Sequence, residues 1–491
     1  MNGFSTPVIG LFVAVFVLIF LVLRTKVHPL IAMILAACIA GVAGGMTLNA
    51  TVDSITRGFG TTLGSIGIVI GLGVMMGRIL EVSGAAEQIA RSFVHWLGHR
   101  RETWAMALTG YFVSIPIFVD SAFVILFPIV RALAKKTNRS LLALGVALAG
   151  GLVVTHTLVP PTPGPLGAAG IFGVDVGAMM LLGMALAIPP VIAVVLYAQW
   201  LGGKYPHVPW DPLAVPSPIG RARESEQGTR PPPAIVLSWL PIAVPIALIF
   251  VKALAALVPH GQTDSHTVAM ALLQVVAFAG TPVIALSVGT LIAVYTLVPW
   301  LDRKESNARM EEGLQAAGII LLVTGAGGAL GAVVRDSGAG TALARQIRDL
   351  PVSPVMLPFF VATAVRLIQG SGTVACITAA SITAPVLAVI PEVNMLMAAQ
   401  SAVAGALCFS YFNDSLFWVV NRMMGLTDIR QQIFAWSLPT TLAWGVAGTG
   451  VAVLNLAFGS GGSLVDPVVP IIVVITIVVA IRYKPKKAGA A

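Results

Sequence analysis

Residues 71–93 read GLGVMMGRILEVSGAAEQIARSF, and residues 325–347 read GAGGALGAVVRDSGAGTALARQI. The two stretches are identical at eight of twenty-three positions without a gap: three glycines, a Ser-Gly-Ala run and an Ala-Arg pair. An internal repeat of this kind indicates that the chain is built from two related halves. The polar segment 202–233 separates the two copies and is interpreted as a cytoplasmic linker.

The composition is that of a membrane protein. Hydrophobic residues make up 57% of the 491 residues, charged residues make up 10%, and the mean hydropathy is +0.93. A soluble chain would carry about a quarter charged residues. The apolar runs 7–23 and 467–481 are close to the length that spans a bilayer. We therefore predict an all-α polytopic membrane protein embedded in the lipid bilayer. Segment 7–23 is predicted to be a retained helix and not a cleaved signal peptide.

The charges and cysteines exclude several other classes. The net charge of +9 follows from basic loops, so no nucleic-acid partner is expected. The three cysteines lie in apolar segments at no metal-binding spacing, so we predict no metal site and no cofactor.

Each half is predicted to follow one pattern of helices. The pattern is three spans, a short amphipathic arm helix, a re-entrant hairpin, a broken helix and a last plain span. In the first repeat (1–201) these are 7–23, 29–46, 58–80, arm 84–97, hairpin 104–131, broken helix 140–175 and 176–200. In the second repeat (234–456) they are 234–256, 267–298, 313–334, arm 338–350, hairpin 355–390, broken helix 395–425 and 432–456. Residues 457–491 supply a final helix, 467–483, and a basic cytoplasmic tail, while 267–298 is long enough to cross once or twice.

The distribution of basic residues predicts the topology. Both flanks of 104–131 are basic, so this segment should enter and leave the membrane on the cytoplasmic side. Each half then crosses five times, and the odd number inverts the second half relative to the first. With a periplasmic N-terminus and a cytoplasmic C-terminus, 23 of the 29 lysines and arginines face the cytoplasm. The exceptions are Arg57, Lys252, Arg335, Arg345 and Arg348 outside, and Arg366 within a segment.

Polar residues interrupt four of the apolar segments, two in each half, and these breaks predict the binding site. Non-helical backbone is tolerated at membrane depth where it lines a polar cavity or is buried in protein. Only two of the twenty acidic residues, Asp120 and Asp414, are predicted to lie within the membrane, and each occupies a break. The predicted substrate-binding residues are Asp120, Ser121, Thr155, His156, Thr157, Gly164, Arg366, Gln369, Gly370, Ser371, Gly372, Thr373, Asn413, Asp414 and Ser415.

Each of these residues also has a structural interpretation. Asp120, Asp414 and His156 are the candidates for proton coupling, but the carboxylates could be helix caps and the imidazole could bond a neighbouring carbonyl. Arg366 suits a substrate carboxylate, or it could pair with an acid or extend to the surface. The hydroxyls suit a polyhydroxy substrate or could bond their own helix carbonyls. The glycines are required by tight turns in either case.

The chain resembles the gluconate permease (GntP) family of bacterial sugar-acid symporters over nearly its whole length. The resemblance rests on residues 58–90 and on the motifs SIPIFVDSAFVILFPI, THTLVPPTPGPLGAAG, RLIQGSGTVACITAAS and SYFNDSLFWVVNR. It implies proton-coupled uptake of gluconate or a related small hydroxy acid across the bacterial inner membrane. The family is grouped with ion-transporter carriers, and this grouping implies a homodimer that works by an elevator motion. In such carriers the hairpins and broken helices form a transport domain that moves against a scaffold.

Alternative functions are an uncoupled channel or facilitator for the same anions, and a symporter for glycerate or a hydroxylated amino acid such as serine. Sodium coupling is a further alternative, because Asn413 and unwound carbonyls could coordinate the ion. A membrane-embedded enzyme is disfavoured, because the chain has neither a HExxH motif nor a GxSxG motif.

Overall fold

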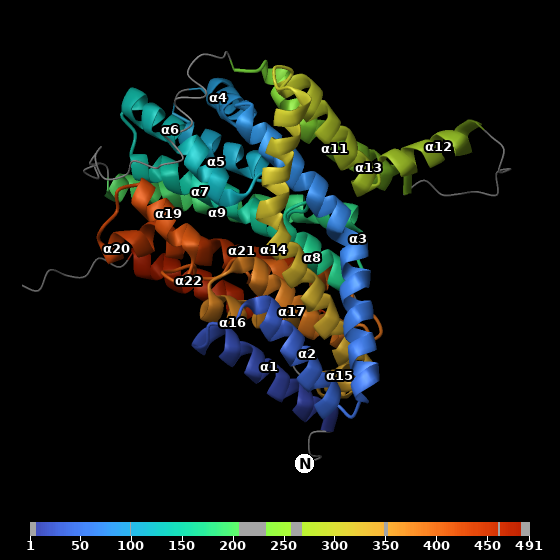
Figure 1. Cartoon of the computed structure of the whole chain (residues 1–491). Coiled ribbons are helices and arrows are strands. Elements are labelled where there is room, and N and C mark those ends of the chain that lie inside the picture. Colours follow the sequence, from blue (N-terminus) through green and yellow to red (C-terminus); the bar gives the residue numbers. More distant parts are fainter. Residues whose placement is uncertain are drawn as a thin grey trace, which may run out of the picture.

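The computed structural model describes residues 6–98, 100–205, 232–256, 268–347, 352–459 and 462–482, and these contain helices and no strands (Figure 1). Most of the predicted linker, the end of the second arm helix and the basic tail lie outside the described residues. The first half consists of α1 (Thr6–Arg24), α2 (Pro29–Ala43), α3 (Leu48–Val82), α4 (Ala85–Leu97), α5 (Glu102–Val113), α6 (Val119–Thr137), α7 (Leu141–Leu158), α8 (Pro163–Phe172) and α9 (Val176–Lys204).

The second half runs in a similar order. It consists of α11 (Ile235–Ala256), α12 (Val268–Ala279), α13 (Pro282–Ile292) with a π-turn (Ala293–Leu297), α14 (Arg303–Asp336), α15 (Ala339–Ile347), a 3₁₀ turn (Pro354–Met356), α16 (Leu357–Gln369), α17 (Gly372–Leu387), α18 (Met395–Gly405), α19 (Ser415–Met423), α20 (Ile429–Gln432), a π-turn (Ile433–Ser437), α21 (Leu438–Phe458) and α22 (Val468–Arg482). Among the described residues, six helical stretches are long and apolar enough to cross a membrane. The protein is therefore an all-helical polytopic membrane protein.

The long helices α3 and α14 pack against each other and run antiparallel. Arg57 near the start of α3 pairs with Asp336 at the end of α14, at 2.6 Å. Arg78 near the end of α3 pairs with Glu312 near the start of α14, at 2.5 Å. Between these ion pairs the helices touch through small residues, and a Cβ on Gly58 would lie only 2.6 Å from the Gly328 carbonyl oxygen. Glycine is needed there because two helix backbones approach closely in the membrane.

Both central helices begin about ten residues before the expected spans 58–80 and 313–334. Their N-caps explain the extension. The Thr47 side chain accepts a hydrogen bond from the Ala50 amide, and the Asp302 carboxylate accepts one from the Glu305 amide. Each cap starts the helix in its polar flank, before the apolar residues begin.

Corresponding helices of the two halves make corresponding contacts. The pair α1 and α2 in the first half matches the pair α11 and α13 in the second. Helix α2 packs on α14, and α13 packs on α3. The arms are exchanged between the halves, because α11 packs on α4 while α1 packs on α15 (Figure 1). The segment expected at 267–298 is broken at Gly280-Thr281, between α12 and α13.

Four chain breaks bring helix ends into the interior. They separate α5 from α6, α7 from α8, α16 from α17 and α18 from α19. The tightest break is Gly370-Ser371, where Gly370 adopts a φ of +91° that favours glycine. A Cβ at Gly370 would also collide with the backbone of Asn413, so the α16–α17 break lies directly against the α18–α19 break.

Candidate functional site

The four breaks surround one cavity of about 350 Å³. The starts of four helices line it: Val119-Asp120 of α6, Gly164-Pro165 of α8, Gly372-Thr373 of α17 and Ser415-Leu416 of α19. The first amides of a helix have no partner within the helix and carry a partial positive charge. Four such starts around one space favour an anion there.

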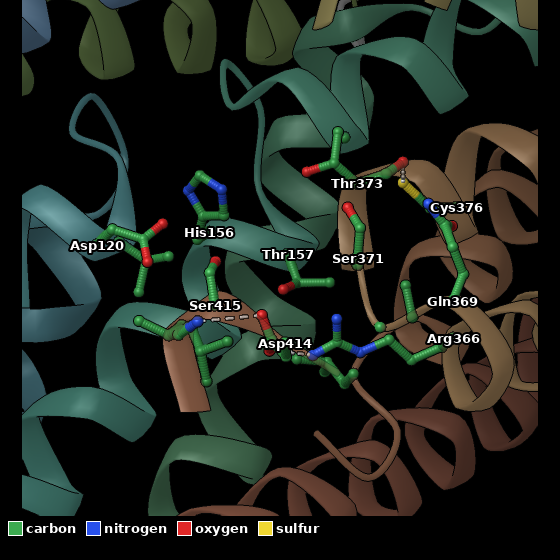
Figure 2. A pocket seen from close by; sticks show the side chains of 18 of the residues that line it. Asp120, His156, Thr157, Arg366, Gln369, Ser371, Thr373, Cys376, Asp414 and Ser415 are labelled. Atoms are coloured by element: carbon green, nitrogen blue, oxygen red, sulfur yellow. Dashed lines mark hydrogen bonds and ion pairs between the residues drawn. The ribbon is translucent and has the colours of Figure 1, made fainter. Parts of the chain in front are cut away.

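One basic side chain lies in the cavity wall. Arg366, near the end of α16, donates from Nη2 to Asp414 Oδ2 at 2.7 Å and from Nε to the Cys408 carbonyl at 3.4 Å. The two side chains are only 6% and 12% exposed, so neither extends to the surface. Figure 2 shows Nη1 of Arg366 directed toward Ser371, and no described residue accepts a hydrogen bond from that nitrogen.

Asp414 is held by three donors. Its Oδ2 accepts from Arg366 and from the Ser410 hydroxyl, the latter at 2.5 Å. Its Oδ1 accepts from the Leu416 amide at 3.2 Å and so caps α19. Trp436 Nε1 in turn donates to Ser410 Oγ at 2.7 Å. Asp414 is therefore both a helix cap and an ion-pair partner.

Asp120 and His156 lie on the opposite side of the cavity from Arg366 and Gln369 (Figure 2). Asp120 is exposed, and the space it faces is the cavity. Among the described residues it forms no ion pair. His156 lies at the end of α7, and its Nδ1 is buried without a hydrogen-bond partner in the described structure. These two ionisable groups are thus available to ligands or protons.

Hydroxyl and amide groups complete the lining. Thr157, Ser371, Thr373, Gln369 and Asn413 all face the cavity. Gln369 Oε1 and Asn413 Oδ1 are buried without partners in the described part of the chain. Their unused acceptors are where the hydroxyls of a ligand could donate.

Two predicted site residues lie outside this lining. Ser121 follows Asp120 on α6, and Thr155 precedes His156 on α7, where it is fully buried. Successive side chains on a helix point about 100° apart, and at these two positions that rotation turns the side chain away from the cavity. The other predicted residues, Asp120, His156, Thr157, Gly164, Arg366, Gln369, Gly370, Ser371, Gly372, Thr373, Asn413, Asp414 and Ser415, line the cavity together.

Apart from apolar lining residues, three residues of the site were not predicted. Cys376 lines the cavity three residues after Thr373, on the same helix face, so helical spacing could have identified it. Ser410 stands four residues before Asp414 within the same motif. Trp436 lies far along the chain, and no local pattern connects it to Ser410.

The chain matches the model of the GntP family permeases over residues 6–457. It is 58% identical to an uncharacterized permease of Haemophilus influenzae, over 99% of this chain and 100% of the relative. It is 34% identical to the high-affinity gluconate transporter of Escherichia coli, over 92% and 99% of the two chains. It is 31% identical to the D-serine transporter DsdX of the same species, over 85% and 91%.

Solved structures share the fold at low sequence identity. The YdaH transporter of Alcanivorax borkumensis superposes with a TM-score of 0.61 at 14% identity, covering 93% of this chain and 100% of that one. MtrF of Neisseria gonorrhoeae, described as one of a class of antimetabolite efflux pumps, gives the same TM-score and identity over 87% and 96%.

Proposed function

The chain belongs to the GntP family of permeases, and from that premise we propose that it imports gluconate or a related small hydroxy acid together with protons. As a member of this family it is a transporter and not an enzyme, and it is an integral protein of the inner membrane.

The observation that carries the substrate class is the meeting of four helix starts with one arginine. Together they provide partial positive charges and a guanidinium group in a space of about 350 Å³. Arg366 binds the substrate carboxylate through Nη1, which its pairing with Asp414 leaves available. Gln369, Asn413, Thr157 and Ser371 bind the substrate hydroxyls.

Proton coupling is assigned to Asp120 and His156. An ionisable group within a membrane segment is a functional hypothesis by default. Asp414 is less suited to this role, because protonation would break its ion pair with Arg366 and weaken the cap of α19. Asp120 makes no ion pair with a described residue and does not cap a helix, and it faces the cavity. It can therefore gain and lose a proton without disturbing the surrounding helices.

The transport motion is proposed to be of the elevator type in a homodimer with a periplasmic N-terminus. The antiparallel pairing of α3 with α14 and the exchange of arms between the halves support two inverted repeats. The hairpins α5–α6 and α16–α17, together with the broken helices, would form the moving part around the cavity.

A hydroxylated amino acid such as serine is the second candidate substrate. Asp120 supports it, because a carboxylate facing the cavity opposite Arg366 could bind an ammonium group while Arg366 binds the carboxylate. The D-serine transporters among the relatives agree with this possibility.

Uptake by proteoliposomes tests both candidates. Uptake of labelled gluconate and of labelled D-serine is measured separately under an inward proton gradient without sodium, each in competition with the other compound, with glycerate and with hexuronates. Accumulation that a protonophore abolishes is the expected result, and the stronger competitor identifies the substrate. Uptake that proceeds only downhill would show a facilitator, and dependence on a sodium gradient would refute proton coupling.

A further inference from the structure

A second cavity, of about 670 Å³, lies between α4, α5 and α6, away from the substrate site. The arm helix α4 supplies Arg91 and His95, the start of α5 supplies Glu102, and the second half of α6 supplies Ile129, Leu133 and Lys136. Figure 1 shows these three helices grouped together. The proposed transport reaction uses none of these residues.

The charge of this cavity is positive. Arg91, His95 and Lys136 are exposed, and none forms an ion pair with a described residue. Glu102 is buried and already occupied, because it accepts a hydrogen bond from the Arg100 amide at 3.1 Å and pairs with Arg139 at 3.7 Å. Two permanent cations and a histidine therefore face the cavity without compensation, which favours an anionic ligand.

One wall of the cavity is apolar. Val94 of α4 and Pro128, Ile129 and Leu133 of α6 line it beside the basic side chains. Ile129 is half-buried and Leu133 is buried, so the apolar surface is recessed below the charged rim. A soluble anion would gain nothing from this wall, whereas a lipid could place an acyl chain against it.

Aromatic residues mark the depth of this region in the membrane. Trp96 of α4 is 64% exposed, and its ring stacks on Trp239 of α11 with centroids 6.4 Å apart. Phe93 packs against both tryptophans. Exposed tryptophans on an amphipathic helix concentrate at the level of the lipid headgroups. These tryptophans therefore favour a position of α4, and of the cavity beside it, near the phospholipid phosphates.

We propose that this cavity binds an anionic phospholipid, with its phosphate between Arg91 and Lys136 and an acyl chain along the α6 wall. Basic pockets between helices on the cytoplasmic side suit such headgroups. Helix α6 connects the lipid to transport, because it begins at the substrate cavity and reaches Lys136 sixteen residues after Asp120, a rise of about 24 Å. An occupied cavity would hold the α5–α6 hairpin against the arm helix α4.

Native mass spectrometry of the purified protein, titrated with phosphatidylglycerol or phosphatidylcholine, tests this proposal without reference to the transported substrate. The wild type should retain phosphatidylglycerol in preference to phosphatidylcholine. The double variant Arg91→Gln/Lys136→Gln should bind phosphatidylglycerol about 30-fold more weakly, because each basic residue contributes about 1 kcal/mol to the affinity for anionic lipid. The variant Ala132→Trp, which fills the cavity without changing its charge, should also lose phosphatidylglycerol.

The matched control is Lys26→Gln/Lys304→Gln. It removes the same charge from two exposed lysines outside the cavity and should bind phosphatidylglycerol like the wild type. Unchanged binding by the Arg91/Lys136 variant would overturn the proposal, as would equal loss by the control. Displacement of the lipid by millimolar inorganic phosphate would also overturn it, because the site would then take a free anion.

Discussion

Asp120 and Asp414 each stand at the start of a half-helix that faces the same cavity, α6 in the first half and α19 in the second, yet their surroundings differ. Asp414 accepts hydrogen bonds from Arg366, Ser410 and the Leu416 amide. Asp120 faces open space and has no ion-pair partner among the described residues. One carboxylate is thus held by three donors, while the other is left without an ion pair at the cavity.

Replacing Arg366 should have the largest effect. Arg366→Gln leaves the buried Asp414 carboxylate without its counter-ion, which costs about 3 to 5 kcal/mol for a buried pair. We expect the affinity for substrate to fall by about 100-fold or more. Gradient-driven uptake and exchange should both decrease as a result. Isothermal titration on the purified protein measures the binding.

The double variant Arg366→Gln/Asp414→Asn separates folding from binding in this prediction. It removes both charges, so thermal stability should recover relative to Arg366→Gln while binding stays lost. Recovery of binding would mean that the guanidinium serves only to neutralise Asp414.

Replacing Asp120 should remove coupling and keep the fold. Asp120→Asn breaks no ion pair, so the melting temperature should stay close to that of the wild type. Concentrative uptake under a proton gradient should be abolished, while exchange of labelled for unlabelled substrate continues. The comparison is Asp414→Asn, which should instead lower the melting temperature. If these two phenotypes are interchanged, the assignment of roles is wrong.

Replacing Ser410 tests the support of Asp414 by a smaller change. Ser410→Ala removes a hydrogen bond to a charged group and leaves Trp436 Nε1 without its acceptor. A hydrogen bond to a charged group contributes about 1.5 kcal/mol or more, so the KM for uptake should rise about tenfold. Ser121→Ala, on the opposite side of the site and outside the cavity lining, is the control and should leave KM unchanged.

Replacing His156 should have the smallest effect on rate and a distinct effect on pH dependence. His156→Gln keeps a polar group at the end of α7 and removes the titrating imidazole. Loss of one neutral hydrogen bond from the imidazole to a bound substrate corresponds to a decrease of about three- to tenfold in uptake. The uptake rate should become less dependent on pH. A pH profile identical to that of the wild type would leave Asp120 as the sole proton carrier.

Most of the residues that line the cavity could be predicted from the sequence, because polar residues inside apolar segments must be buried in protein or line a polar cavity. Asp120, Arg366 and Asp414 stood out for that reason alone, and the structure brings them to one cavity. Rotation about the helix axis was not predictable, and so Ser121 and Thr155 were included although they face away. The support of Asp414 by Trp436 was also missed, because it depends on how α21 and its π-turn pack against the α18–α19 break.

The exchange of arms has a consequence for how the two halves depend on each other. The first helix of each half packs on the arm helix of the other, α1 on α15 and α11 on α4, while α3 and α14 are joined by ion pairs at both ends. Each half therefore completes its neighbour's hydrophobic surface. We therefore expect each half to depend on the other for its folding. Two separately synthesised halves would still carry these contacts, so we expect them to associate.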